Sequence, residues 1–191
     1  LCMGRDIRWG LSNADGTIDP ERTLDHLASA AMELARAGID ALVTVGRFNF
    51  EVAVARAALD AIRPGIALWG FSTNSETPTA YFSTTSNFLG KANTGQKIIV
   101  GNLWEMLVRA LRDAYEGVDV VIQKPIESFH LLALLSAICD RRMSLESVVK
   151  QPVVERLLDQ DAGGFGCEWI TSDTLRNRLD TLRLGAYEVS G

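Results

Sequence analysis

Apolar and polar positions along this chain follow two periods, one typical of amphipathic helices and one of buried strands. Apolar residues recur at helical spacing over 20–37, directly after Asp19 and Pro20, a pair that favours a helix start. Gly38 suits the helix end, and the apolar run at 39–45 then predicts a strand. The first unit predicted is a helix followed by a strand.

The same pattern occurs twice more. Helical periodicity covers 52–62 and 103–115, and runs of aliphatic residues follow at 66–71 and at 118–123. Asn102 can cap the helix at 103–115, whose predicted buried stripe consists of Met106, Leu107, Ala110, Leu111 and Ala114. Helices and strands that alternate through short joints predict a parallel sheet with right-handed crossovers. The predicted fold class is therefore α/β.

The last third of the chain adds helices before a final strand. An apolar helix is predicted over 128–139, and 186–189 predicts a further strand with Ser190 at its tip. Between them, 143–183 carries helical segments interrupted at Pro152 and by a glycine-rich turn. We interpret this segment as a helical insertion within a single domain that covers 1–191.

A polar stretch separates the second predicted strand from the next helix. Residues 75–96 are rich in Ser, Thr, Asn, Gly and Pro. A stretch of roughly 20 such residues inside a compact domain is either a lid or binding loop, or a solvent-exposed loop. The sequence leaves both interpretations open.

Composition narrows the classes of partner. The chain has 191 residues, 47% of them hydrophobic and 23% charged, and a formal net charge of −5. That charge argues against a nucleic-acid or anionic-membrane surface, and no apolar run approaches the roughly 20 residues of a membrane span. The three cysteines are odd in number and far apart, which favours reduced thiols in a cytoplasm.

One lysine stands at a position suited to chemistry. The strand predicted within Asp119–Pro125 (DVVIQKP) ends at Lys124, and α/β proteins place their active sites at the carboxyl ends of parallel strands. A lysine held among apolar neighbours loses its charge more easily, and the neutral amine attacks carbonyl carbons. The alternative is a lysine that extends from the strand end into water. The spacing of residues alone does not favour either the reactive lysine or the solvent-exposed one.

The order of these segments resembles the porphobilinogen synthase (5-aminolaevulinate dehydratase) family. The resemblance is collinear and is carried by five stretches of this sequence: ADGTIDPERTLDHLASAAMELARAGIDALV, the helix through RAALD, LWGFST, NLWEMLVRALRDAYEGVDVVIQKP and AYEVSG. It implies a (β/α)8 barrel of TIM type, of which this chain covers only part because such barrels usually take ~250 residues.

The resemblance also implies site residues and a substrate. Lys124 matches the family lysine that forms a Schiff base with 5-aminolaevulinate, and Tyr187 and Ser190 match its Tyr-x-Val-Ser-Gly strand end. Ser190 would bind the substrate carboxylate, although a strand-end hydroxyl that starts a turn is an equal alternative. The implied partner is a small amino-keto acid, and the implied assembly is a homo-oligomer.

Several positions depart from the family pattern. Asn74 stands where the family has a second active-site lysine, and Lys97, beside Gln96, stands where it has a substrate-binding glutamine. Asn74, Gln96 and Lys97 remain candidates for substrate binding because each can hydrogen-bond a carboxylate, carbonyl or amine. The acidic family loop corresponds to 45–51, in which both aspartates are replaced.

A metal site is not expected. The zinc loop of the family has three clustered cysteines, and only Cys2 remains in this region. A catalytic zinc requires three protein ligands, so we predict no metal and no other cofactor. His26 and His130 lie on predicted helices without acidic or cysteine neighbours at ligand spacing, and we interpret both as structural or surface residues.

Three functions are therefore considered. The first is a divergent Schiff-base enzyme, a hydro-lyase that condenses or dehydrates 5-aminolaevulinate or a related amino-keto acid through Lys124. The second is a catalytically dead or substrate-switched homologue that acts as a binding or assembly subunit. The third is a lysine aldolase-type barrel that shares only the strand-end lysine.

Overall fold

The computed structural model describes residues 11, 13–14, 19–44, 49–71, 73, 103–124, 126, 129–159 and 168–188. Within these ranges a single sheet contains four parallel strands in the spatial order β1-β2-β3-β4. The strands are β1 (Ala41–Val43), β2 (Ala67–Gly70), β3 (Val120–Gln123) and β4 (Arg183–Ala186). The predicted α/β class with a parallel sheet is confirmed.

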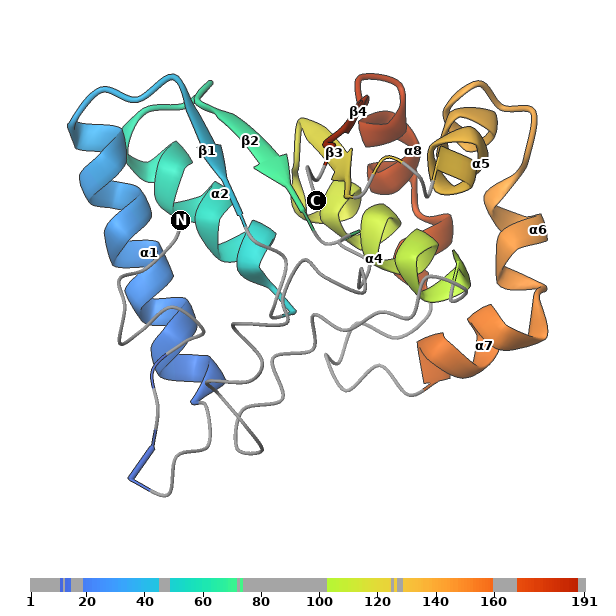
Figure 1. Ribbon diagram of the computed structural model, residues 1–191, viewed down its shortest axis with the longest axis horizontal. Helices are drawn as coiled ribbons and strands as arrows, with labels where there is room; N and C mark the ends of the chain where they lie inside the picture. Colours follow the sequence, from blue (N-terminus) through green and yellow to red (C-terminus); the bar gives the residue numbers. More distant parts are fainter. Residues whose placement is uncertain are drawn as a thin grey trace.

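The strands follow one another in space in the same order as in the chain (Figure 1). A sheet that winds in one direction with right-handed crossovers places its helices on one face, as in a (β/α) barrel. A doubly wound sheet instead reverses its strand order at a switch point and carries helices on both faces. The observed order is therefore that of a barrel segment.

Burial along the strands shows which face the helices cover. Leu42, Leu68 and Val121 alternate onto one face and are almost completely buried. On the other face Val43 and Val120 are half-buried, and Trp69, which lies opposite both, is 39% exposed. We call this second face the open face of the sheet. It corresponds to the interior of a closed barrel.

The first two helices begin and end as local chemistry dictates. Helix α1 (Pro20–Arg36) starts at Asp19, whose side chain accepts a hydrogen bond from the Arg22 backbone, and the chain turns after it at Gly38 with a φ of 90°. Helix α2 (Glu51–Ile62) follows Phe50, which has a left-handed φ of 72° and no side-chain cap. The sequence predicts both helices correctly to within two residues.

Helix α4 (Leu103–Glu116) is the centre of the core. Its inward stripe is completely buried and consists of Met106, Leu107, Ala110, Leu111 and Ala114. These are the five residues that helical spacing assigns to the buried face, and this prediction is confirmed. Asn102, predicted as the cap, lies outside the described residues.

The segment after β3 forms helices that pack onto the same core. They are α5 (Phe129–Cys139), α6 (Leu145–Val149), α7 (Pro152–Asp159), the 3-10 helix η2 (Glu168–Thr171) and α8 (Asp173–Leu179). Side chains of α7, η2 and α8 lie in one apolar cluster with those of α4. The helices of 143–183 are thus present as predicted, whereas the assignment of a single domain with an insertion remains a prediction.

The last strand was predicted at the wrong position. Strand β4 spans Arg183–Ala186 instead of 186–189, because its backbone pairs with β3 from Val120 opposite Arg183 to Gln123 opposite Ala186. Arginine and glycine carry no strand signal of their own, so the pairing with β3 decides the register. Arg183 therefore belongs to the strand and not to the insertion.

None of the helices in the described ranges combines the length and the apolar character that a membrane crossing requires.

Candidate active site

Lys124 directly follows β3, at the carboxyl end of the sheet. Because side chains alternate along a strand, Lys124 shares a face with Val120 and Ile122, and this is the open face. The lysine is half-buried. Its side chain therefore lies against protein on one side of the sheet, at the end where barrel enzymes bind their substrates.

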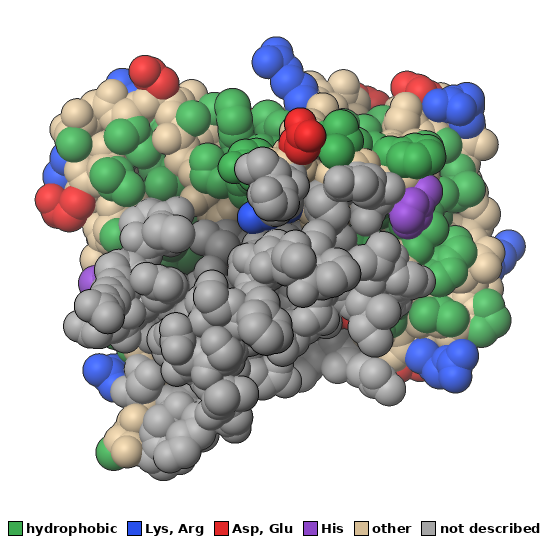
Figure 2. Space-filling model, in the orientation of Figure 1, with side chains coloured by type: hydrophobic (Ala, Val, Ile, Leu, Met, Phe, Trp, Pro, Cys, Tyr) green, Lys and Arg blue, Asp and Glu red, His purple; other side chains and the backbone are tan. Residues whose placement is uncertain are grey.

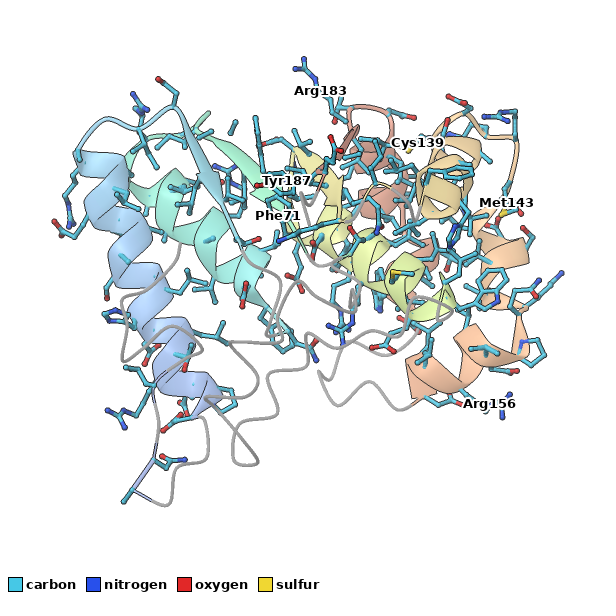
Figure 3. The ribbon with its side chains drawn as sticks, viewed as in Figure 1. Phe71, Cys139, Met143, Arg156, Arg183 and Tyr187 are labelled. Carbon is cyan, nitrogen blue, oxygen red and sulfur yellow. The ribbon has the colours of Figure 1, made fainter. Side chains whose placement is uncertain are left out.

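Tyr187 is the aromatic neighbour of this lysine. The Nζ atom of Lys124 lies 5.3 Å from the centroid of the Tyr187 ring, within the range of a cation–π contact. The Phe71 ring meets Tyr187 edge-on, with 6.1 Å between their centroids, and Figure 3 shows the two side chains together at the strand ends. An apolar and aromatic wall thus borders the amine on the side of β2 and β4.

Hydrogen bonds hold the three strand ends together beneath this wall. The Tyr187 N–H donates to the Gln123 carbonyl at 2.9 Å, and the Ile126 N–H donates to the Tyr187 carbonyl at 3.1 Å. The buried Thr73 hydroxyl donates to the Ile122 carbonyl at 2.7 Å, which connects the chain after β2 to β3. These bonds fix the backbone on both sides of Lys124.

The predicted site residues divide into two groups. The structure brings Lys124 and Tyr187 together, and their roles in catalysis and substrate binding remain predictions. Asn74, Gln96, Lys97 and Ser190 lie outside the described residues, so their roles remain predictions.

Two residues that contact Tyr187 or the end of β3 were not predicted as site residues. Phe71 and Thr73 lie at the end of β2, the strand that pairs with β3. The sequence shows that both residues lie at the end of a predicted strand. Only the order of strands in the sheet shows that this strand, β2, lies beside β3, the strand that ends at Lys124.

No three His, Cys, Asp or Glu side chains of the described residues gather in a way that could hold a metal ion. Cys2 and Cys167 lie outside those residues, so the absence of a zinc site remains a prediction.

Burial is the main cause that raises the pKa of the Cys139 thiol, which is therefore protonated at neutral pH. His26 and His130 are both exposed on helices.

A second group of charged residues lies where α2 begins, at Glu51. A Glu116 carboxylate oxygen accepts a hydrogen bond of 3.1 Å from the Ala53 N–H in the first turn of α2. Burial is the main cause that raises the pKa of Glu116, Ala53 and Arg112 oppose the shift, and the nearby Glu51 adds to it, so that the pKa is about 7. This carboxyl group therefore titrates near neutral pH.

Comparison with known proteins yields one curated relative and a set of similar structures. No family model matches the chain. A protein of Arabidopsis thaliana described as "Probable delta-aminolevulinic acid dehydratase 2, chloroplastic" is 30% identical over 131 residues, which are 66% of this chain and 31% of the relative. The chain thus spans about a third of the length of this relative.

A solved structure with a similar fold is the delta-aminolevulinic acid dehydratase (porphobilinogen synthase) of Toxoplasma gondii ME49, determined with the product porphobilinogen. The TM-score is 0.56 at 19% sequence identity, over 93% of this chain and 53% of that one. This likeness establishes the fold, a partial TIM barrel, as predicted. The curated relative, the collinear sequence segments and this shared fold together support a divergent member of the porphobilinogen synthase family.

Proposed function

We propose that this protein forms a Schiff base between Lys124 and the ketone of 5-aminolaevulinate or a related amino-keto acid, and thereby catalyses a condensation or dehydration. Its family includes dehydratases, which are lyases, and this supports an enzyme of the same class. The observation that carries the proposal is the position of Lys124 at the carboxyl end of β3, half-buried on the open face against Tyr187.

The chemistry of the proposed step follows from that position. The neutral amine attacks the ketone carbon, and loss of water from the addition product leaves a protonated imine. The imine withdraws electrons, so the neighbouring carbon loses a proton more easily and can form a new bond. The face of the Tyr187 ring lies 5.3 Å from Nζ, close enough to stabilise the positive charge of the protonated imine once it has formed.

The departures from the family pattern bear on the substrate. Asn74 replaces the second lysine, and an amide cannot form an imine. We therefore propose that only one substrate molecule is bound covalently, and that a related amino-keto acid is a candidate substrate beside 5-aminolaevulinate. We expect a cytoplasmic enzyme without a cofactor.

Borohydride trapping tests the proposal. The protein is incubated with 5-aminolaevulinate or other ketones, treated with borohydride and digested, and the peptide that contains Lys124 is analysed by mass spectrometry. We expect a stable adduct on Lys124 in the unmodified protein and none in Lys124→Arg, which keeps the charge but does not form the imine.

The alternatives give different results. A catalytically dead homologue that acts as a binding or assembly subunit, which the loss of the second lysine favours, gives no adduct with any carbonyl compound. An adduct that forms only with aldehydes or simple ketones, and not with amino-keto acids, favours an aldolase-type enzyme.

A further inference from the structure

Gln123 is a polar residue in an apolar layer. It is the last residue of β3, directly before Lys124, and it is completely buried. Alternation along the strand places its side chain on the face of the sheet that the helices cover, opposite to the face of Lys124. The other strand residues on this covered face, within the described part of the sheet, are all apolar: Leu42, Leu68, Gly70, Val121, Leu184 and Ala186. A buried amide among such neighbours destabilises the fold unless it is hydrogen-bonded.

The side-chain amide of Gln123 donates a hydrogen bond to the next residue of the chain. Its Nε2 atom lies 3.2 Å from the Lys124 carbonyl oxygen. The backbone carbonyl of Gln123 accepts a bond of 2.9 Å from the Tyr187 N–H. Residue 125 is a proline, and a proline restricts the residue before it to extended conformations. The peptide unit after Lys124 is thus oriented by a side chain from the covered face and by the proline that follows.

These bonds bear on the direction in which the Lys124 side chain leaves the strand. The bond from Tyr187 fixes the peptide unit before the Lys124 Cα atom, and the bond from the Gln123 amide fixes the unit after it. When both peptide units are fixed, the direction of the Cα–Cβ bond between them is fixed as well. The side chain therefore starts toward the open face, where Nζ lies 5.3 Å from the centroid of the Tyr187 ring.

The position of this amine needs such a constraint. Figure 2 shows hydrophobic side chains gathered over the strands and α5. A lysine beside an apolar surface tends to extend its ammonium group into water. The Tyr187 ring is 52% exposed, and a cation–π contact at an exposed site is weak. The position of Nζ therefore depends on the backbone from which the side chain starts.

We propose that Gln123 is a positioning residue, which orients Lys124 toward its substrate from the opposite face of the sheet. This role rests on the proposed function of Lys124. Gln123 acts only through the lysine, because its own side chain is completely buried on the covered face. In the alternative, the amide only stabilises the fold, and its loss leaves the position of the amine unchanged.

Two variants separate these roles. Gln123→Met keeps a side chain of similar length, removes the donor and suits the apolar layer. Gln123→Glu has no donor while its carboxyl group is ionised, but the protonated acid can donate to the Lys124 carbonyl. Since burial raises the pKa of a carboxyl group, the acid form should predominate at about pH 5. The control Thr44→Val removes another buried donor, the hydroxyl that lies 3.4 Å from the Trp69 carbonyl oxygen near the end of β1.

Reductive methylation with formaldehyde and cyanoborohydride measures the position of the amine without a ketone substrate. The methylation rate of Lys124 is divided by that of Lys150, which is exposed at the end of α6. Each variant is compared with the unmodified protein at the same pH, which cancels the effect of pH on the amines. In Gln123→Met this ratio should rise at least about twofold, because the amine moves into water. In Gln123→Glu it should rise likewise at about pH 9 and match the unmodified protein at about pH 5. Thr44→Val should leave it unchanged.

No rise in Gln123→Met, an equal rise in Thr44→Val, or a raised ratio in Gln123→Glu at about pH 5 would each overturn the proposal. If Gln123→Met does not fold, the change of the ratio in Gln123→Glu between the two pH values decides.

Borohydride trapping tests the function separately. If the unmodified protein forms the ketone adduct, Gln123→Met should form it at least about twofold more slowly, and an equal rate would also overturn the proposal. If the unmodified protein forms no adduct, the proposed function fails, whereas the methylation ratio still decides whether Gln123 orients Lys124.

Discussion

At the scale of single residues, the pair of Lys124 and Tyr187 is the most informative contact in the molecule. The two residues are 63 positions apart in the sequence and meet because β3 and β4 are neighbours, with the Tyr187 N–H bonded to the Gln123 carbonyl. The aromatic ring lies 5.3 Å from Nζ, on the open face of the sheet. An amine in this position is half-buried and is bordered by an aromatic ring.

Substitution of Tyr187 separates the contribution of the ring from that of its hydroxyl. Tyr187→Ala should slow the trapping of a ketone on Lys124 about 2–5-fold, because a cation–π contact at an exposed site contributes roughly 0.5–1 kcal/mol. Tyr187→Phe keeps the ring, and its trapping rate should stay within about twofold of the unmodified protein. Equal losses in both variants would mean that the hydroxyl, and not the ring, is responsible.

At the scale of the elements, Glu116 connects the helices α4 and α2. It lies in the last turn of α4 and accepts a hydrogen bond from the first turn of α2. Arg112, one turn earlier, lies with its guanidinium 5.5 Å from the centroid of the Trp169 ring in η2 and 5.9 Å from that of Phe50. This group of side chains ties the start of α2, η2 and α4 together.

The stability of the protein should therefore depend on the charge of Glu116. Its pKa in the folded protein is about 7, above the ordinary 4.5, so burial favours the protonated form. The contribution of this group to the free energy of unfolding is fully present below the ordinary pKa and is lost as the pH rises through 7. Between about pH 5 and pH 8 the loss should be on the order of 2 kcal/mol.

Glu116→Gln tests this linkage, because the amide stays neutral and keeps an oxygen that can accept from Ala53. In denaturant unfolding at several pH values, the variant should lose less stability with rising pH and be more stable than the unmodified protein at pH 8. Glu105→Gln removes a carboxylate near the other end of α4, where it pairs with Arg109, and serves as the control. An unchanged pH profile in Glu116→Gln would contradict the prediction.

At the scale of the whole molecule, one apolar core joins the barrel segment to the helices after β3. Leu175 of α8 and Ile170 of η2 are completely buried and lie in the same cluster as Leu107 and Leu111 of α4. The outer side of α4, which a barrel helix usually exposes to solvent, is thus covered by a later part of the chain. These helices should unfold together with the sheet.

Leu175→Ala tests this cooperativity. Removal of a completely buried leucine should lower the free energy of unfolding by about 2–5 kcal/mol, in a single transition seen by both far-ultraviolet circular dichroism and tryptophan fluorescence. Val153→Ala, at an exposed position of α7, should change it by less than about 0.5 kcal/mol. A small effect of Leu175→Ala, or two separate transitions, would show that the helices after β3 unfold independently.

The sequence by itself determined the helices, the α/β class and the resemblance to the porphobilinogen synthase family. The five buried residues of α4 recur at helical spacing, and Asp19 with Pro20 marks the start of α1, since caps and amphipathic stripes are local properties. The lysine at the end of β3 could also be singled out from the sequence, because an apolar run that ends in Lys-Pro is a local pattern as well.

Only the tertiary structure decided the register of β4, the burial of Glu116 and the neighbours of Lys124. Arg183, Leu184 and Gly185 become a strand because β3 offers hydrogen bonds at that register. Phe71, Thr73 and Tyr187 lie near the lysine or its strand because β2 and β4 are the strands beside β3. Pairing between distant segments depends on the free energy of the whole sheet, which no local window of sequence contains.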